Sequence, residues 1–323
     1  MSSNHRDSRD HRESCGKTKT AQFRQRLFYK PGIVISAGVY DALSARVCEL
    51  AGFEVVHHSG FGTAAVQLGM PDVGLLSMTE MAHQVAAIAR AVQIPVLADG
   101  DNGFGNAINA FRTVQEFIRA GAVGMFLEDQ VIPKRCGHME GKQVISWEEM
   151  EGKLRAGMDA RNELDPDFLI IYRTDAIAVT GFQDALERAH RAVDLGVDMV
   201  FVEALETLPQ IEQVGKDLGI KRKIPLMLNL IEGGKTPLVS YQEAEEMGYR
   251  YVVAALTCLF SATRAMLEQM KKVRASGVSL EYADRIVSFQ EFTQIVHLPE
   301  IQEMEGKYLP RYIKSKRGQP ENF

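Results

Sequence analysis

The chain has 323 residues, of which 46% are hydrophobic, and its formal net charge at pH 7 is −5. A chain of this length can bury a large core, and a weak negative charge without a basic stripe argues against nucleic acid as a partner. No apolar run approaches the ~18 residues that span a bilayer, so no membrane partner is expected. The polar N-terminus also lacks the apolar core of a secretory signal.

Four cysteines are spread through the sequence, at Cys15, Cys48, Cys136 and Cys258. They form no CxxC pair, which predicts free thiols in a reducing compartment rather than a disulfide framework or a zinc site. We therefore expect a cytoplasmic protein.

Apolar strand-like runs alternate with helical segments along most of the chain. Residues 1–20 are highly charged and predict a disordered polar tail, and a short helix is expected at 21–27. The expected strands are residues 33–36, 54–58, 96–99, 124–128, 169–173, 199–203, 226–229 and 251–254. The helices expected between them include 42–51, 79–91, a segment around 111–118, 147–161, 182–195, 208–218 and 240–247.

Several of these helices end in a glycine just before the next strand, as at Gly121, which is the C-cap that a right-handed crossover uses. Eight strands, each followed by a helix, predict an α/β fold, the (β/α)8 barrel of TIM type. We expect a single barrel domain with its C-terminal helices at 21–300, and a C-terminal extension at 301–323. Beyond the barrel pattern, helices are expected at 261–275 and around 280–296.

Polar residues stand where the expected strands end. In a barrel of this kind the active site lies at the C-terminal ends of the strands, and a purely structural barrel needs no polar set there. The residues are Ser59, Gly60, Asp99, Asp101, Glu128, Arg173, Glu203 and Asn229. Among them, the guanidinium of Arg173 suits bidentate binding of a carboxylate, although an ion pair with Asp175 is the alternative.

Three carboxylates, those of Asp99, Asp101 and Glu128, follow two successive strands and should therefore lie side by side at one sheet edge. Converging carboxylate oxygens with room for water are what Mg²⁺ prefers. A single acid at a strand end more often caps the next helix. The three together predict a Mg²⁺ site, with Mn²⁺ as an alternative ion.

A thiol stands among cationic side chains in the segment Lys134-Arg135-Cys136-Gly137-His138. Such neighbours depress the pKa of a thiol, which can then exchange a proton with a carbon centre. A lone cysteine is more often an inert buried residue, but a polar loop flanked by glycines is a poor place to bury one. The glycines instead suit a loop that closes over a substrate.

Four motifs between residues 99 and 142 resemble the isocitrate lyase/phosphoenolpyruvate mutase superfamily: DGDNGFGN, LEDQ, PKRCGH and EGK. The resemblance covers about residues 33 to 275. It implies that Cys136 protonates a departing carbanion and that Asp72 lies near the metal. It also implies that the Ser59-Gly60 pair, with Phe61 beside it, grips a 2-oxo-acid carboxylate.

Further site residues are implied by the same resemblance. Tyr40 would hydrogen-bond a developing oxyanion, and the segment from Asn229 through Glu232 and Gly233 would help to bind a second carboxylate. Substrate contacts are also expected from Lys134, Gly137, His138 and Glu203. The family's C-terminal helices would be exchanged between subunits, so a homo-oligomer is expected, either a dimer or a homotetramer.

The expected activity is that of a Mg²⁺-dependent carbon–carbon lyase acting on a substituted malate or isocitrate-type dicarboxylate, a small di- or tricarboxylate substrate. The sequence Asp99-Gly100-Asp101, together with the lack of proline in residues 255–258, favours dimethylmalate-lyase-like over methylisocitrate-lyase-like members. A carboxyphosphonoenolpyruvate-type phosphonomutase and an oxaloacetate decarboxylase or hydrolase remain alternatives. A catalytically inactive barrel that serves as a scaffold is a fourth.

Overall fold

The computed structural model describes residues 18–137, 139, 141–277 and 286–310. The expected tail up to residue 17, His138, part of the expected helix around 280–296 and the end of the C-terminal extension lie outside the described residues.

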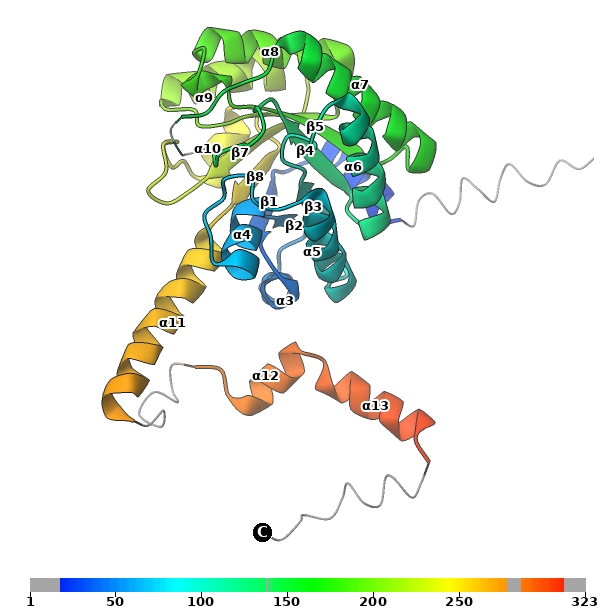
Figure 1. Ribbon diagram of the computed structural model, residues 1–323, viewed down its shortest axis with the longest axis vertical. Coiled ribbons are helices and arrows are strands. Elements are labelled where there is room, and N and C mark those ends of the chain that lie inside the picture. Colours follow the sequence, from blue (N-terminus) through cyan, green and yellow to red (C-terminus); the bar gives the residue numbers. More distant parts are fainter. Residues whose placement is uncertain (1–17, 138, 140, 278–285, 311–323) are drawn as a thin grey trace, which may run out of the picture. The chain divides into compact units, whose positions relative to one another are not determined.

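Eight parallel strands close into a barrel in sequence order (Figure 1), which confirms the predicted (β/α)8 fold. The strands are β1 (Val34–Val39), β2 (Val56–His58), β3 (Val96–Asp99), β4 (Gly124–Glu128), β5 (Leu169–Thr174), β6 (Met199–Val202), β7 (Leu226–Leu230) and β8 (Tyr251–Ala254). In the register between β4 and β5, Glu128, the last residue of β4, pairs with Arg173 of β5. β1 closes the barrel against β8.

Helices surround the strands (Figure 1). They are α2 (Lys19–Tyr29), α3 (Ala42–Leu50), α4 (Gly60–Leu68), α5 (Met78–Ala91), α6 (Ala107–Ala120), α7 (Trp147–Leu164), α8 (Phe182–Leu195), α9 (Leu208–Val214) and α10 (Tyr241–Glu246). A π-helical turn, Gly215–Ile220, continues α9, and a single 3-10 turn, Ala176–Ala178, follows β5. Helix α4 was not predicted from the sequence.

The barrel core consists of inward side chains from the strands, closed at the end where the strands begin by helix α2. Phe23 and Leu27 of α2 are buried in the same cluster as Phe126, Phe201 and Tyr251 of the barrel interior. The ring of Phe23 meets that of Tyr251, the first residue of β8, edge to face at 6.2 Å. The opposite end of the barrel is left for polar side chains.

The chain divides into two compact units, Met1–Ser261 and Ala262–Phe323. Helix α11 (Thr257–Ser276) begins in the first unit and continues in the second, which also holds α12 (Phe289–Ile295) and α13 (Leu298–Tyr308). Neither α12 nor α13 has a buried residue in the described part of the chain. Across the described residues, every helix is too short or too polar to span a membrane.

Candidate active site

The C-terminal ends of the strands bring most of the predicted site residues to one small cavity of about 50 Å³. Asp99 and Glu128 end β3 and β4, Arg173 lies in β5, Asn229 lies in β7, and Glu203 directly follows β6. The described residues that line the cavity are His57, Ser59, Phe61, Asp72, Asp99, Phe126, Cys136, Gly137, Arg173, Phe201, Glu203, Met227, Asn229, Ile231, Val253, Ala255 and Leu256.

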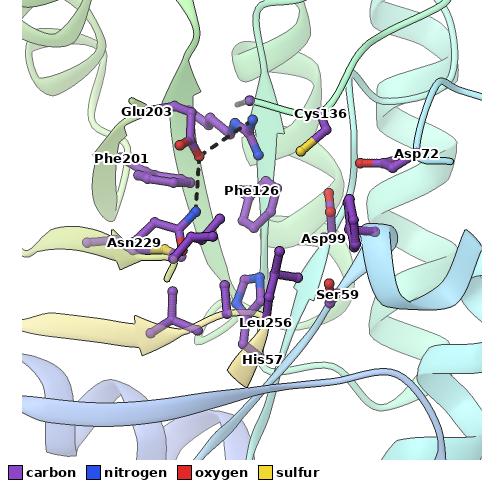
Figure 2. Close-up of a pocket in the computed structure, with 17 residues that line it drawn as sticks. His57, Ser59, Asp72, Asp99, Phe126, Cys136, Phe201, Glu203, Asn229 and Leu256 are labelled. Carbon is purple, nitrogen blue, oxygen red and sulfur yellow. Dashed lines mark hydrogen bonds and ion pairs between the residues drawn. The ribbon is translucent and has the colours of Figure 1, made fainter. Parts of the chain in front are cut away.

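Figure 2 shows two sides of this cavity. Cys136, Asp72 and Asp99 lie on one side, and Glu203 and Asn229 lie on the other. The site therefore places a thiol and carboxylates opposite an amide and a further carboxylate.

Asp99 is held rigidly by the backbone. One carboxylate oxygen, Oδ2, accepts from the amide of Gly60 at 3.1 Å, and the other, Oδ1, accepts from the amide of Asp101 at 3.0 Å. Burial opposes ionisation of Asp99, but the charges of Lys134 and Arg173 together with the hydrogen bond from the Asp101 amide lower its pKa. Asp99 is therefore a fixed, ionised carboxylate that faces the cavity. The Gly60 amide, predicted to bind a substrate carboxylate, is engaged by Asp99.

Lys134 sits between two other acids of the predicted metal set. Its Nζ lies 2.6 Å from Oδ1 of Asp72 and 2.7 Å from Oδ1 of Asp101. Burial, reinforced by the charges of Asp99 and Asp72, raises the pKa of Asp101 to about 7 despite this lysine. Lys134 thus compensates part of the negative charge of these buried acids.

Glu128 is completely buried, and neither carboxylate oxygen accepts a hydrogen bond from a described residue. Its closest charge partner is Arg173, whose Nε lies 3.3 Å from Oε2. Burial raises the pKa of Glu128 well above its usual value. A buried carboxylate that accepts no hydrogen bond is costly, because a neighbouring charge alone does not fully replace its lost hydration.

The acids fit a divalent oxygen-preferring cation that is held largely through water. Among the described residues, no three His, Cys, Asp or Glu side chains converge closely enough to form a ready-made metal cluster. Mg²⁺ does not require one, because it keeps several waters and uses only one or two carboxylates directly. The fixed carboxylate of Asp99 and the unsatisfied oxygens of Glu128 are donors of the required kind.

Arg173 is clamped in place beside the cavity. Its Nε and Nη2 donate to the two carboxylate oxygens of Asp175 at 2.9 and 3.2 Å. The guanidinium carbon also lies 5.6 and 5.3 Å from the ring centroids of Phe126 and Phe201. The ion pair with Asp175, which the sequence left open as an alternative to substrate binding, is therefore present. Arg173 nevertheless lines the cavity. Burial works against its charge, but the carboxylates of Asp175, Glu128 and Glu203 raise the pKa of Arg173.

A network of contacts that was not predicted from the sequence supports both Arg173 and the loop that carries Cys136, called the cysteine loop below. Lys142 is buried; its Nζ lies 2.9 Å from Oδ1 of Asp175 and also donates to the carbonyl of Gly137. Burial opposes the ionisation of Asp175, but Arg173 and Lys142 lower its pKa to about 2. The only sequence signal was the EGK motif, which ends in Lys142.

Cys136 is half-buried and lines the cavity. Its backbone amide donates to the carbonyl of Asp72 at 3.1 Å, and its carbonyl accepts from the amide of Met139 at 2.8 Å. The backbone of Asp72 and the side chain of Lys142 therefore fix the loop that carries the thiol.

Asn229 and Glu203 form the opposite wall. The amide Nδ2 of Asn229 lies 3.4 Å from Oε2 of Glu203, which in turn lies 3.6 Å from Nη2 of Arg173 (Figure 2). The amide oxygen of Asn229 is buried and accepts no hydrogen bond from a described residue. It is thus available to a donor group of a bound molecule.

Several predicted site residues lie elsewhere. Among the described residues that line the cavity, Tyr40, Gly60, Glu128, Glu232 and Gly233 are absent. Tyr40 hydrogen-bonds the thiol of Cys258 instead, while Glu232 is exposed and accepts from the hydroxyl of Thr257. Asp101 and Lys134 line a neighbouring pocket of about 360 Å³. His138 lies outside the described residues.

Apolar and aromatic side chains complete the cavity and were not predicted. His57 stacks on Phe126 with ring centroids 5.3 Å apart, and burial lowers its pKa to about 4, so its imidazole is neutral at pH 7. Phe201 and Leu256 also line the cavity. Such walls exclude water, which strengthens electrostatic interactions inside the site.

Gly137 is the position at which a small change should disturb the site most selectively. A Cβ there would lie 2.6 Å from Cγ of Glu203 and 2.7 Å from Nη2 of Arg173. We expect Gly137→Ala to lower kcat/KM by roughly 10- to 100-fold, the scale of a ~1 Å misplacement in an active site. Steady-state kinetics would measure this.

The matched control is Gly152→Ala in α7, where the nearest atom would lie 3.8 Å from the new Cβ. This helical substitution should leave activity unchanged and raise stability by about 0.5–1 kcal/mol. Equal kinetics for the two variants would contradict the steric role of Gly137.

The closed parallel barrel with a charged cavity at the C-terminal ends of its strands defines the class of the (β/α)8-barrel enzymes. Within that class, residues 23–274 match the family described as phosphoenolpyruvate phosphomutase, and the chain belongs to this family. The predicted resemblance is confirmed.

Three curated relatives align over most of the chain. It is 39% identical over 291 residues to the 2,3-dimethylmalate lyase of Eubacterium barkeri, covering 90% of this chain and 98% of the relative. It is 41% identical over 287 residues to the chloroplastic carboxyvinyl-carboxyphosphonate phosphorylmutase of Arabidopsis thaliana, covering 88% and 83%. Identity to the 2-methylisocitrate lyase of Aeropyrum pernix is 38% over 270 residues, covering 84% and 85%.

Two solved structures superpose on most of the chain. Oxaloacetate acetylhydrolase in complex with 3,3-difluorooxalacetate superposes with a TM-score of 0.84 at 32% identity, covering 90% of this chain and 97% of that one. Phosphonopyruvate hydrolase in complex with oxalate and Mg²⁺ superposes with a TM-score of 0.81 at 29% identity, covering 91% and 100%. The family thus includes carbon–carbon lyases alongside phosphorus-transfer enzymes and hydrolases.

Proposed function

We propose that the protein is a Mg²⁺-dependent carbon–carbon lyase, working in the cytoplasm, that cleaves a substituted malate or an isocitrate-type 2-hydroxy dicarboxylate. The products would be a 2-oxo acid such as pyruvate and a carboxylic acid. The observation that carries the proposal is that the Cys136 thiol, the Arg173 guanidinium and the Asp99 carboxylate line one small cavity. The relatedness to two named lyases supports it.

Substrate binding would use groups that the fold already holds in place. Arg173, clamped by Asp175, presents a charged planar fork that matches a carboxylate. Ser59 lies at the N-terminus of α4, an end that favours negative charge. The unsatisfied amide oxygen of Asn229 would accept from a substrate hydroxyl.

The thiol of Cys136 would deliver a proton to the carbon that leaves when the C2–C3 bond of the substrate breaks. Because the backbone of Asp72 and the side chain of Lys142 fix this loop, the thiol is positioned before the substrate arrives. Proton transfer from a positioned acid contributes ~10²- to 10⁴-fold to a rate.

The metal would be held mainly by Asp99, with Asp101, Glu128 and Asp72 acting through water. When bound, Mg²⁺ supplies positive charge beside the substrate oxygen that becomes negative, worth on the order of several kcal/mol. Lys134, now paired with Asp72 and Asp101, holds these two acids together. Mn²⁺ offers the same coordination chemistry and is the alternative ion.

A phosphonomutase is the second candidate, because one relative of similar identity is a phosphorylmutase. Oxaloacetate decarboxylation or hydrolysis is the third, on the evidence of the acetylhydrolase structure. A proton donor at the cavity favours the lyase over the mutase, because phosphorus transfer leaves no carbanion to protonate.

A substrate panel tests the proposal. Purified protein would be incubated with substituted malates, 2-methylisocitrate, oxaloacetate and phosphonopyruvate, with Mg²⁺ and with a chelator, and assayed for pyruvate and oxalate. We expect Mg²⁺-dependent pyruvate release from a malate or isocitrate-type acid. Turnover of phosphonopyruvate or oxaloacetate alone would favour the second or the third candidate.

We also propose that the chain assembles into a dimer or a tetramer through its C-terminal helices. Helices α12 and α13 bury no residue within the described chain, and Phe289 of α12 is 85% exposed. An apolar helix surface of this kind suits a protein interface. Light scattering at micromolar concentration should therefore show an oligomer.

The exposed Phe289 offers a sharp test of this interface. Phe289→Glu should lower the measured mass to that of a smaller assembly, whereas Gln290→Glu, an exposed control on the same helix, should not. A monomeric wild-type chain would refute the assembly.

A further inference from the structure

Two thiols outside the active site lie against each other on the flank of the barrel. Cys48 is buried in α3, and Cys258 lies in the first turn of α11. The two side chains share a hydrogen bond, and Cys258 packs against the apolar cluster that contains Cys48. Residues far apart in sequence thus place two thiol side chains beside each other.

A pocket of about 650 Å³ opens onto this pair. Both cysteines line it, and its other walls are mostly apolar, including Phe53, Leu230 and Leu238. An inert buried thiol needs no such access. Here both thiols border a pocket that shares no lining residue with the active-site cavity.

The surroundings favour the thiolate of Cys258 over that of Cys48. The hydrogen bond from Cys48 and a second from Tyr40 lower the pKa of Cys258 to about 7, against burial and the charge of Asp41. The start of a helix also favours a thiolate. The same hydrogen bond, together with burial, raises the pKa of Cys48. Among the described residues that line this pocket, Glu232 is the one with a charged side chain.

We propose that Cys48 and Cys258 form an oxidisable thiol pair, in which Cys258 reacts first with a hydroperoxide and Cys48 resolves the product to a disulfide. In the first step the Cys258 sulfur attacks one peroxide oxygen, the O–O bond breaks, and water or an alcohol leaves. The sulfenic acid of Cys258 is then attacked by the Cys48 sulfur, the S–S bond forms, and a second water leaves.

The step balances with hydrogen peroxide as the oxidant. Two thiols lose two electrons and two protons, and one peroxide becomes two waters. The disulfide would link α3 to the first turn of α11. Cys258 lies two residues after Leu256, which lines the active-site cavity.

The expected rate advantage is modest. A thiol with a pKa of about 7 is half ionised at pH 7, against roughly 3% for an ordinary thiol with a pKa of ~8.5. The lower intrinsic nucleophilicity of a more acidic thiol removes about fivefold of this gain. We expect Cys258 to react about threefold faster than an unperturbed thiol at pH 7, with an alkylation rate half-maximal near pH 7.

The test treats the reduced full-length protein with one equivalent of hydrogen peroxide, blocks remaining thiols with iodoacetamide and maps linked peptides by mass spectrometry. A Cys48–Cys258 peptide pair should be the main product, and Cys136→Ser should leave its yield unchanged. Oxidation of Cys258 to the sulfinic acid without a linked peptide, or oxidation of Cys136 while Cys258 stays reduced, would overturn the proposal.

Single variants test the order of the steps. In Cys48→Ser, the sulfenic acid of Cys258 should persist and be trapped by dimedone. In Cys258→Ser, dimedone should not label Cys48. The reverse labelling pattern would overturn the assignment of Cys258 as the attacking thiol, and each variant's circular dichroism spectrum confirms that it is folded.

Discussion

Replacing Asp99 with alanine is expected to abolish turnover at any practical Mg²⁺ concentration while leaving the barrel folded. Asp99 is the acid whose two carboxylate oxygens are both fixed by backbone amides and whose pKa is lowered, so it remains ionised and in place. Burial instead raises the pKa values of Asp101 and Glu128. Losing Asp99 removes the donor best prepared for the metal.

Two measurements separate this loss from unfolding. The amides of Gly60 and Asp101 lose their acceptor, which should cost about 1–3 kcal/mol each, so the thermal midpoint should fall but the transition should stay cooperative. Kinetics over a Mg²⁺ titration measure the activity. Asp194→Ala removes a surface acid that is 65% exposed and is the charge-matched control. Near-normal turnover of the Asp99 variant would sink the metal assignment.

The second large effect is expected at Cys136. Serine keeps the approximate size of the side chain but has a pKa far above the ~8.5 of a thiol, so it is a poor proton donor. For a lyase we expect Cys136→Ser to lower kcat by ~10²-fold or more, the usual scale of general acid catalysis. Cys258→Ser, the same exchange outside the cavity, serves as the control under reducing conditions.

Oxalate binding separates a chemical role from a structural one. Oxalate mimics a pyruvate enolate, and we expect its binding to require the metal site and Arg173 rather than the thiol. Mg²⁺-dependent thermal stabilisation by oxalate should therefore survive in Cys136→Ser. A scaffold barrel would show no response to oxalate even in the wild type. If Cys136→Ser cleaves every active substrate at the wild-type rate, the thiol is not the acid.

The strands could be predicted because their physical signal is local. Runs such as residues 124–128 and 169–173 are apolar and end in a charge, so they identified β4, β5 and the site residues Glu128 and Arg173. Helix α4 was missed because its Gly-rich sequence resembles a turn. Its glycines reflect close packing: a Cβ on Gly60 would lie 2.6 Å from Asp99, and one on Gly62 would lie 2.6 Å from Tyr40.

The supporting contacts of the site could not be predicted, because they depend on tertiary approach. Nothing in the sequence places Lys142 against Asp175 and the carbonyl of Gly137, although these contacts hold the cysteine loop. The pairing of Lys134 with Asp72 and Asp101 was likewise invisible. The expectation for Tyr40 came from resemblance, which does not record that its hydroxyl contacts Cys258.

The central claim, that the protein cleaves a carbon–carbon bond and that the released carbon is then protonated, is tested most directly in D₂O. The protein would be incubated with Mg²⁺ and 2,3-dimethylmalate or 2-methylisocitrate, and both products would be analysed by mass spectrometry. The account predicts equal amounts of a 2-oxo acid and a carboxylic acid, with one deuterium at the carbon that left. Cleavage of neither acid, or a carboxylic acid product without deuterium, would contradict it.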